Sequence, residues 1–524
     1  MREPLRIVVV GGGPVAARLV EELRPALTVG AVQVTVVGEE PVPAYQRIRI
    51  GDVASGRIDG ATLSMLDPEE LSAIGVEIRC GVTAVSIDRP SRTVHLQDGS
   101  SVLFDRLVLA TGAEAVIPEF PVTGAVGGIV PTAPTAEQPA GVMALRDLAD
   151  ARRLHEAVRQ GDPVVVLGGG VLGVEAALAL AEVGAAVTLL YRGAVPLERH
   201  LDRDAGMLLR RELARAGVQV KSDCGVQQLI VAARAEDRAT PDDGVPRLVA
   251  VRTTQGGRLA SALLVACTGV RPRDELARAA GLTTLSRGGV VVDRAGRSPD
   301  DPAVLAIGDC AAPLGERPTG LIGPGWDQAH AAALALRDDA GCPAEVERDA
   351  AGQPVPALQP SAEPRADRLD PLILKSHTLS LACAGTVTAD PWDPEGPDVS
   401  TWTDPRAGQY LRIVTEGERL LGFISVGLPR SAAELSRHCL TGTIPVADRS
   451  SLLALEYAAG DTLLSPEDVL CRCSGATAGQ VEEAAGDCET VDAVGDRCGA
   501  GTGCGTCRSQ IEEMLAKQPA GSPA

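Results

Sequence analysis

Aromatic residues are scarce in this chain of 524 residues, where phenylalanine, tryptophan and tyrosine together make up 2%. A protein that stacks nucleic-acid bases on aromatic side chains is therefore not favoured. Positive charge is also limited, because only three lysines occur and the formal net charge is −20. Affinity for phosphate backbones comes largely from Lys and Arg, so we expect no nucleic-acid partner.

Long apolar runs are missing as well. No run reaches the roughly 18 residues of a transmembrane helix. The apolar segment at residues 5–10 is too short for a signal peptide. We therefore expect a cytoplasmic protein without membrane contact, in which the 13 cysteines are free thiols or metal ligands. Hydrophobic residues at 45% and charged residues at 23% are typical of globular proteins and exclude wholesale disorder.

A glycine-rich turn follows the first apolar segment. Residues 5–10 have the composition of a parallel strand that is buried on both faces. The next residues have the GxGxxA pattern, in which Gly11, Gly13, Pro14 and Ala16 are the expected ligand contacts. Such glycines permit close approach of the backbone to a pyrophosphate, and the helix that follows points its free N–H groups at it. The turn is predicted to bind a dinucleotide, with a glycine-rich packing turn as the alternative.

The rest of this unit follows the expected order. We expect the helix to stop at the residue before Pro25, because proline disfavours helical geometry in its predecessor. The next strand covers residues 32–37, and Glu39 follows it. An acidic side chain at that place can accept hydrogen bonds from a ribose diol.

The same pattern returns after a strand at residues 163–167, with Gly168, Gly170 and Gly173 in the turn. Two such units suggest two dinucleotides. After the next strand, Arg192 takes the place at which an acid would repel a ribose 2′-phosphate, and Arg199 lies close enough in sequence to assist. An arginine can neutralise that phosphate, which favours NADPH over NADH. In the alternative, both arginines are ordinary surface residues and the enzyme accepts either coenzyme.

Three further segments complete a resemblance. They end in Ala110-Thr111-Gly112, in Cys-Thr-Gly at Gly269, and in Gly-Asp at Asp309. With the two glycine turns, they resemble the glutathione-reductase-like flavoprotein reductases over residues 1 to about 335. This resemblance implies FAD in the first unit and NAD(P)H in the second. It also implies that Asp309 meets the ribityl chain of FAD and that the Ala-Thr-Gly segment lies at the crossover between the two domains.

Residues 43–53 contain no cysteine, although disulfide reductases of this class carry their redox pair there. The stretch is similar to the Tyr-x-Arg segment of ferredoxin and rubredoxin reductases, and most similar to the flavin portion of the large subunit of bacterial NAD(P)H nitrite reductase. By this resemblance Arg47 contacts FAD, Trp326 starts a helix that approaches the flavin, and Glu175 approaches the nicotinamide. Ordinary packing or solvated roles for Arg47 and Trp326 are the alternative.

Four cysteines form two close pairs near the end of the chain, namely Cys471, Cys473, Cys504 and Cys507. Four thiolates can ligate a metal centre. Structural zinc usually takes a CxxC pair at both ends, whereas the first pair here is CxC. The segment resembles the bacterioferritin-associated-ferredoxin-like domain, which implies that these four hold a [2Fe–2S] cluster. Zinc or free thiols are the alternatives, and the neighbouring Cys488 and Cys498 are expected to be packing residues.

These patterns predict an α/β protein with two Rossmann-like dinucleotide-binding domains, a small α+β domain and a small helical [2Fe–2S] domain. The expected boundaries are 1–140 with 263–336 for the FAD-binding domain, 141–262 for the NAD(P)H-binding domain, 337–370 for a linker or insertion, 371–460 for the α+β domain and 466–518 for the [2Fe–2S] domain.

The expected function is electron transfer from NADPH (or NADH) through FAD and the [2Fe–2S] cluster to an external acceptor. A flavin can exchange electrons one or two at a time, so it can connect a hydride donor to a one-electron cluster. No general acid or base is needed, and no catalytic side chain is predicted.

The family resemblance favours the molybdenum catalytic subunit of an assimilatory nitrate reductase as acceptor. The sirohaem region of nitrite reductase would follow the last domain, and the sequence stops at Ala524, so nitrite reduction within this chain is not expected. The alternatives are a free-standing ferredoxin or rubredoxin reductase, the reductase component of a nitrite reductase system, and a redox sensor.

Overall fold

The computed structural model describes two compact units, Met1–Gly427 with Leu435–Pro445, and Leu428–Glu434 with Val446–Ala524. No helix in the described part of the chain combines the length and apolar character needed to cross a membrane. The described residues are 3–124, 138–232, 246–314, 316–342, 369–376, 378–444, 452–453, 466–467, 469–471, 474, 476–488, 490–502 and 507–516.

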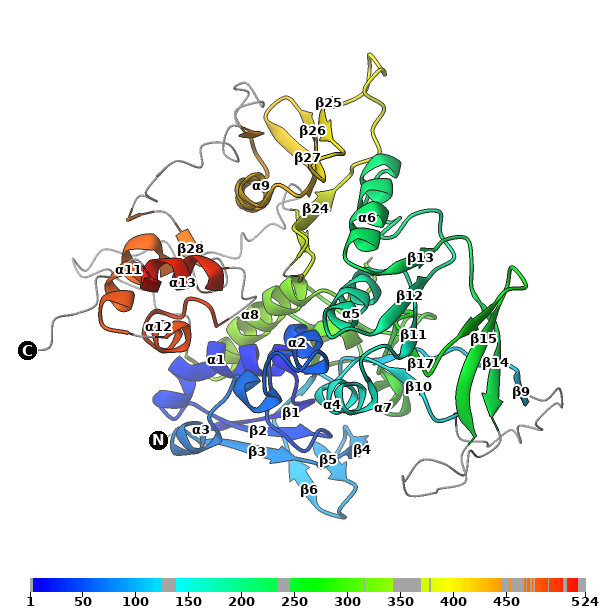
Figure 1. Cartoon of the computed structure of the whole chain (residues 1–524). Coiled ribbons are helices and arrows are strands. Elements are labelled where there is room, and N and C mark those ends of the chain that lie inside the picture. The colour runs from blue at the N-terminus through cyan, green and yellow to red at the C-terminus, as the bar shows by residue number, and fades with distance from the viewer. Residues whose placement is uncertain are drawn as a thin grey trace, which may run out of the picture. The chain divides into compact units, whose positions relative to one another are not determined.

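A six-stranded sheet with the order β20–β21–β7–β1–β2–β3 opens the first unit (Figure 1). Every pairing except β20–β21 is parallel. Helices α1 and α8 pack on one face, and the three-stranded sheet β4–β5–β6 packs on the other. The strands are β1 (Leu5–Val10), β2 (Val32–Gly38), β3 (Val76–Cys80), β4 (Ala84–Asp88), β5 (Thr93–Leu96), β6 (Ser101–Leu103), β7 (Arg106–Leu109), β20 (Arg297–Ser298) and β21 (Asp301–Ala306).

Helices, 3₁₀ turns and short strands accompany this sheet. They include one two-stranded pairing between β8 and β18 and another between β19 and β22. The elements are α1 (Pro14–Thr28), α2 (Ile50–Ala54), α3 (Pro68–Ala73), α7 (Glu275–Ala279), α8 (Ile322–Asp339), β8 (Ala113–Ala115), β18 (Val270–Pro272), β19 (Val290–Val292), β22 (Ala311–Pro313), and the 3₁₀ turns Arg47–Arg49, Gly60–Leu63 and Gly308–Cys310.

Helix α1 does not stop before Pro25, so that prediction was wrong. The helix contains Pro25 and continues to Thr28. A proline inside a helix removes one backbone hydrogen bond and crowds the preceding turn. Here the last turn also brings Ala26 and Leu27 into the core, where they are 0% and 3% exposed, and this burial offsets the cost.

A second parallel sheet, with the order β10–β17–β11–β12–β13, repeats the design. A separate four-stranded sheet, β16–β15–β14–β9, belongs to the same region. The elements are β9 (Val122–Gly124), β10 (Val142–Ala144), α4 (Leu148–Ala157), β11 (Pro163–Leu167), α5 (Val171–Glu182), β12 (Ala186–Leu190), α6 (Arg203–Arg215), β13 (Gln219–Lys221), β14 (Val226–Ala232), β15 (Arg247–Thr253), β16 (Arg258–Ala260) and β17 (Leu263–Ala266).

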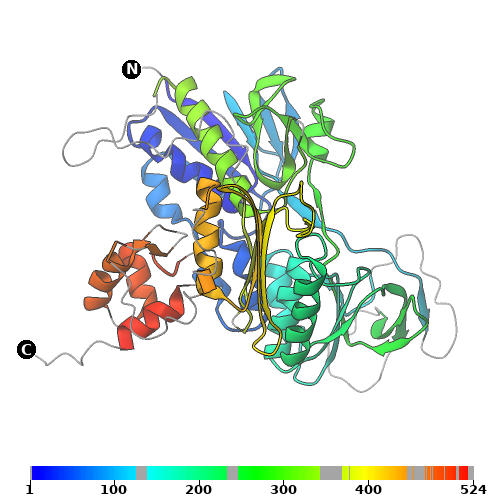
Figure 2. The same cartoon turned by 90° about the horizontal axis from the view of Figure 1, so that it is seen from above.

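An antiparallel five-stranded sheet, with the order β23–β24–β27–β26–β25, follows in the chain. It packs against α6, and Figure 2 shows the two side by side. One hydrophobic core contains Tyr410, Ile424 and Val426 of this sheet together with Leu208 and Leu209 of α6. The elements are β23 (Leu372–Ile373), β24 (Leu381–Gly385), β25 (Asp398–Asp404), β26 (Gln409–Glu416), β27 (Arg419–Val426) and α9 (Pro429–Thr441).

The C-terminal part has its own small core, which includes Val481, Val494 and Ile511. Helix α11 begins with a capping box in which Thr477 and Gln480 bond each other's backbone N–H groups. The elements are β28 (Val469–Cys471), β29 (Ala476–Thr477), α11 (Ala478–Gly486), α12 (Val491–Cys498) and α13 (Arg508–Ala516).

The predicted α/β fold with two dinucleotide-binding units is confirmed by the two parallel sheets, each with a glycine turn after its first βαβ strand. The domain boundaries stay predictions. Most of the expected linker at 337–370 lies outside the described residues.

Candidate functional site

The first glycine turn lies at the carboxyl end of β1. Gly11 has a φ of +118°, and a Cβ atom there would lie 2.1 Å from the carbonyl oxygen of Ala110. Only glycine fits this position. Gly13 is the N-cap of α1, and a Cβ atom there would meet nothing within 4 Å. Pro14 occupies the first helical position, where its missing N–H costs nothing, and Ala16 is buried in the following turn.

The second glycine turn repeats this geometry. Gly168 has a φ of +127°, and a Cβ atom there would lie 2.2 Å from the carbonyl oxygen of Cys267. A Cβ atom on Gly173 would lie 1.9 Å from the carbonyl oxygen of Gly168. Gly170 is the N-cap of α5, and its Cβ position is open. Each turn therefore leaves free space in front of a helix N-terminus, the place where a phosphate binds.

The Ala-Thr-Gly and Cys-Thr-Gly segments lead into paired strands. Strand β8 after Gly112 pairs with β18 after Gly269, and both glycines have positive φ values. The hydroxyl of Thr111 donates a hydrogen bond of 2.6 Å to the carbonyl oxygen of Arg273. The segments after Gly112 and Gly269 are thus connected to each other, next to both glycine turns.

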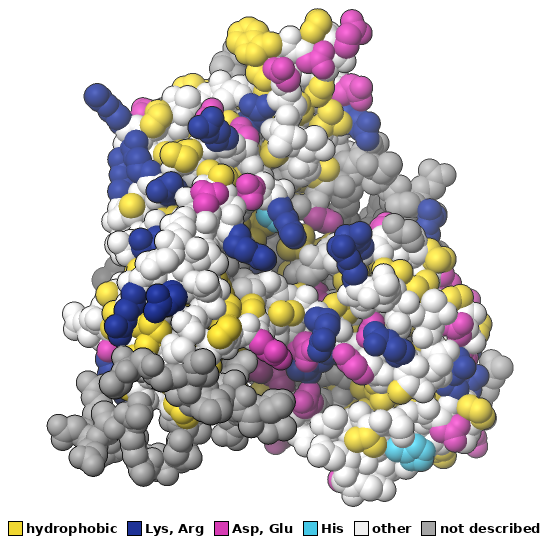
Figure 3. Space-filling view, turned by 90° about the vertical axis from the view of Figure 1, so that its right-hand side faces the viewer, with side chains coloured by type: hydrophobic (Ala, Val, Ile, Leu, Met, Phe, Trp, Pro, Cys, Tyr) yellow, Lys and Arg dark blue, Asp and Glu magenta, His cyan; other side chains and the backbone are white. Residues whose placement is uncertain are grey.

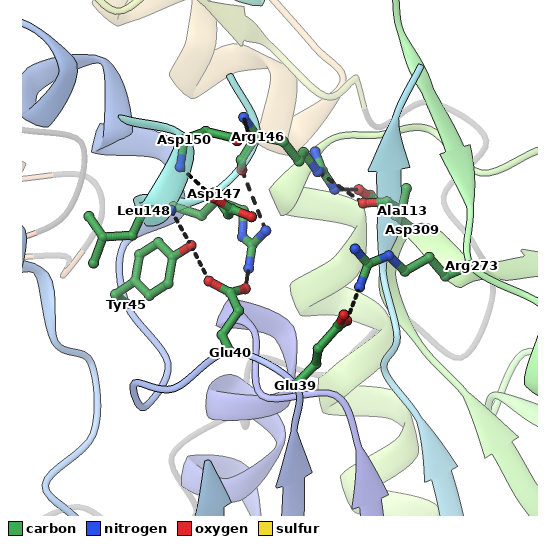
Figure 4. A network of polar contacts seen from close by, with 11 residues as sticks. Glu39, Glu40, Tyr45, Ala113, Arg146, Asp147, Leu148, Asp150, Arg273 and Asp309 are labelled. Atoms are coloured by element: carbon green, nitrogen blue, oxygen red, sulfur yellow. Dashed lines mark hydrogen bonds and ion pairs between the residues drawn. The ribbon is translucent and has the colours of Figure 1, made fainter. Parts of the chain in front are cut away.

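Ion pairs bring the remaining predicted FAD contacts to one region, shown in Figure 4. Glu39 accepts a hydrogen bond of 2.6 Å from Arg273. Arg47 forms an ion pair with Glu40, and its guanidinium carbon lies 5.3 Å from the centroid of the Tyr45 ring. The Tyr45 hydroxyl donates to Glu40 at 2.6 Å, so Glu40 holds both side chains.

Arg146 is a central residue that the sequence did not reveal. Its Nη2 donates to Asp309 at 2.7 Å, and its Nε donates to the carbonyl oxygen of Ala113 at 3.0 Å. The carbonyl oxygen of Arg146 accepts from Arg47 at 3.4 Å. Arg146 therefore joins Asp309 to Arg47, and neither its type nor its spacing distinguishes it from the many other arginines.

Trp326 lies within α8 and not at its start, which is Ile322. Its indole Nε1 is buried and has no hydrogen-bond partner among the described residues. Buried donors are usually satisfied, so this atom is available to a ligand. The open N-terminus of α1 and the free indole N–H fit FAD, and the open N-terminus of α5 fits a second dinucleotide.

Glu175 lies near the start of α5, just after the second glycine turn. Its carboxylate accepts a hydrogen bond of 2.8 Å from the backbone N–H of Lys375. Burial raises the pKa of Glu175, and the Lys375 ammonium partly opposes this shift. Lys375 lies in the turn between β23 and β24 of the small antiparallel sheet, and no sequence pattern indicated it.

Arg192 and Arg199 lie in the segment between β12 and α6, and both are exposed. Within the described residues, no ion pair or hydrogen bond of either guanidinium is present. The preceding residue, Tyr191, is 4% exposed, and its hydroxyl has no partner in the described part of the chain. Figure 3 shows that Lys and Arg side chains are spread over the face drawn there, although the net charge is −20.

The described half of the predicted cluster site consists of Cys471 and Cys507, which are 2% and 4% exposed. A hydrogen bond from Cys507 is the largest cause that lowers the pKa of Cys471 to about 4. A thiolate is the form that ligates iron or zinc, so this pair fits a metal centre. Cys473 and Cys504 lie outside the described residues. Cys498 donates instead to the carbonyl oxygen of Val494 at 3.2 Å, as a packing residue would.

Comparison with known families gives two matches. Residues 5–335 match the pyridine nucleotide-disulphide oxidoreductase family. Residues 469–517 match the BFD-like [2Fe-2S] binding domain. The first family implies FAD and NAD(P)H, and the second implies a [2Fe–2S] cluster.

Two curated proteins are similar to this chain over nearly all of its length. The chain is 26% identical to the nitrite reductase (NADH) large subunit of Escherichia coli over 520 residues, which is 98% of this chain and 55% of that one. It is also 26% identical to the assimilatory nitrate reductase electron transfer subunit of Bacillus subtilis over 514 residues, 97% of this chain and 59% of that one. The chain thus spans a little over half the length of these two relatives.

Among solved structures, the covalent putidaredoxin reductase–putidaredoxin complex is similar, with a TM-score of 0.67 and 22% identity. The match covers 87% of this chain and 100% of that one. It shows that the fold is shared.

Proposed function

Because the chain belongs to the pyridine nucleotide-disulphide oxidoreductase family and is an NAD(P)H-dependent FAD oxidoreductase, we propose that it carries electrons from NADPH through FAD and a [2Fe–2S] cluster to a separate protein. The observation that carries this proposal is the glycine turn built twice, each time with open space before a helix N-terminus. When bound, FAD accepts a hydride and releases electrons singly.

The side chains of the first unit would bind and orient the two dinucleotides. The first turn would hold the FAD pyrophosphate on backbone N–H groups. Glu39 would bind a ribose if its ion pair with Arg273 opens or shares the carboxylate. The remaining FAD contacts in this proposal are Arg47, Ala110, Thr111, Gly112, Asp309 and Trp326, and the NADPH contacts are Gly168, Gly170, Gly173, Glu175, Arg192, Arg199 and Gly269.

We further propose the molybdenum catalytic subunit of an assimilatory nitrate reductase as the acceptor. Similarity to the electron transfer subunit of Bacillus subtilis over 97% of this chain supports this choice. A nitrite reductase system is the second candidate, supported by similarity to the Escherichia coli large subunit over 98% of the chain. The two candidates share the steps up to the cluster and differ only in the acceptor.

An anaerobic NADPH titration, followed by absorption and electron paramagnetic resonance, tests the first part. Bleaching of the flavin together with a reduced [2Fe–2S] signal is expected. Flavin bleaching without a cluster signal would contradict the internal transfer. Adding nitrate with the molybdenum subunit, or nitrite with a sirohaem subunit, then distinguishes the acceptors by which one reoxidises the cluster.

Replacing Arg192 with glutamate is expected to weaken the binding of NADPH much more than the binding of NADH. A charge-assisted hydrogen bond to a phosphate contributes about 1.5–3 kcal/mol, which corresponds to roughly 10- to 150-fold in affinity. Steady-state kcat/KM for both coenzymes measures the difference, and Arg258→Glu, in β16, is the matched control. Equal losses for the two coenzymes would show that Arg192 does not meet the 2′-phosphate.

A further inference from the structure

The small antiparallel sheet contacts the proposed NADPH site at two separate places. One contact is at Asp202, immediately after the residues that carry Arg192 and Arg199. The other is at Glu175, immediately after the second glycine turn. Both contacts lie inside the first compact unit. We call residues 191–201, between β12 and α6, the coenzyme loop.

The first contact involves Asp202, which directly follows the coenzyme loop and caps α6. One carboxylate oxygen accepts from the backbone N–H of Ala205 at 2.9 Å, as an N-cap does. The other accepts from the hydroxyl of Tyr410 and lies 3.5 Å from Nε of Arg412. Tyr410 and Arg412 are on β26 and are 1% and 9% exposed, so this contact is shielded from water.

Arg412 is itself held by the small sheet. Its Nε donates to the carbonyl oxygen of Val387 at 2.8 Å, and its Nη2 donates to the carbonyl oxygen of Ala389. A buried arginine needs such partners, and they leave it one orientation. Asp202 therefore meets a fixed cation and a fixed hydroxyl, which determine where the coenzyme loop ends.

The coenzyme loop is held at its start by the segment between β13 and β14, because Tyr191 and Gly193 accept hydrogen bonds from the N–H groups of Cys224 at 2.9 Å and Asp223 at 3.0 Å. Leu197 has a φ of +55° and donates its N–H to the carbonyl oxygen of Gly169 in the glycine turn at 2.8 Å. Leu197 and Leu201 are buried, whereas Arg192 and Arg199 are exposed. Arg192 is thus placed by the segment between β13 and β14, whereas Arg199 depends on the anchor that follows it, Asp202.

The second contact is the hydrogen bond of 2.8 Å from the N–H of Lys375 to Glu175. Lys375 lies in the turn between β23 and β24, next to Leu374, which is 4% exposed and shares the core of α5. Glu175 is the carboxylate nearest in sequence to the second glycine turn. Its position is therefore set by a segment about 200 residues away in sequence.

We infer that the small sheet is a two-point support of the NAD(P)H site, in which Tyr410 and Arg412 position the coenzyme loop through Asp202, and Lys375 positions Glu175 at the nicotinamide. This inference rests on the proposed function, because it places NADPH on the second glycine turn. It assigns a role in coenzyme selection to a domain that holds neither dinucleotide.

The variant Tyr410→Phe tests the first point, because it removes one hydroxyl and keeps the ring. Isothermal titration of the holoenzyme with NADP⁺, NAD⁺ and adenosine 2′,5′-bisphosphate measures the affinities. We expect about fivefold weaker binding of both ligands that carry a 2′-phosphate, less than the full value of a charged hydrogen bond, because the effect is indirect. NAD⁺ affinity stays nearly unchanged, and KM for NADPH rises while kcat does not.

The matched control is Ile413→Val on the same strand. Ile413 is 1% exposed and points to the face opposite Tyr410 and Arg412, because side chains alternate along a strand. It lowers the melting temperature without touching Asp202, so it is expected to leave all three affinities unchanged. If Tyr410→Phe changes only the melting temperature, as this control does, the first point is overturned.

The variant Lys375→Pro tests the second point, because it removes the backbone N–H that donates to Glu175, and Lys375→Ala, which keeps that N–H, is the matched control. NADP⁺ and NAD⁺ are expected to bind more weakly by the same factor, and adenosine 2′,5′-bisphosphate, which lacks the nicotinamide, is expected to bind as before. Weaker binding of all three ligands by the same factor would overturn the assignment of Lys375 to the nicotinamide end. If the unmodified protein binds none of the three, the proposed function itself fails, which is a different result from unchanged variants.

Discussion

Replacing Cys471 with serine is expected to abolish the [2Fe–2S] signal and to reduce electron delivery to any external protein to background, while NADPH still reduces the flavin. Iron–sulfur clusters are held by cysteine thiolates. The pKa of Cys471 lies at about 4 beside Cys507, so the thiolate is present at neutral pH. A serine hydroxyl stays protonated there and is a poor substitute. Iron and sulfide analysis with electron paramagnetic resonance measures the cluster, and stopped-flow absorption measures flavin reduction.

Two cysteines of the same small unit provide matched controls. Cys488 and Cys498 lie beside the core of this unit and outside the two close pairs. Cys488→Ser and Cys498→Ser are expected to retain the cluster. If either lost it while Cys471→Ser retained it, the ligand set would be wrong. If Cys471→Ser also stopped flavin reduction, the two cofactor sites would not be independent, and the proposed order of transfer would be wrong.

The parts of the fold that the sequence predicted well depend on local patterns. Strands β1 and β11 begin and end at the expected residues, because an apolar run and a glycine turn define both limits. The limit expected at Pro25 was wrong, because the burial of Ala26 and Leu27 depends on a core that includes α8, which is remote in sequence. The local helix propensity of a sequence does not include the free energy of burial against such remote elements.

The site was only partly predictable for the same reason. Glu39 was expected from its position after a strand and Asp309 from the family resemblance, but their partners Arg273 and Arg146 are 234 and 163 residues away. The chain is rich in arginine, so neither partner stands out by type. Lys375 stands out only as one of three lysines, and its hydrogen bond to Glu175 needs the small sheet to be in place. Such pairs of residues are brought together by the topology of the fold, which local sequence patterns do not contain.

Substitutions of the glycines at the two helix N-caps can test ligand binding with little effect on folding. Gly13 and Gly170 have extended backbone angles that alanine also adopts, and a Cβ atom on either meets nothing within 4 Å. Gly13→Ala is therefore expected to fold with a loss of about 0.5–1 kcal/mol, because alanine is a poorer N-cap residue than glycine. Its methyl group would fill the space in front of the helix, so FAD content is expected to fall to near zero.

Gly170→Ala is the reciprocal control, because the same change is made in the second turn. It is expected to retain FAD and to lose NADP⁺ binding. Gly173→Ala, in contrast, puts a Cβ atom 1.9 Å from a backbone oxygen and is expected to destabilise the domain. Flavin absorbance, NADP⁺ titration and thermal unfolding of the three variants measure these effects. Full FAD content in Gly13→Ala would mean that the open space in the first turn does not hold the pyrophosphate, and the assignment of FAD to that turn would fall.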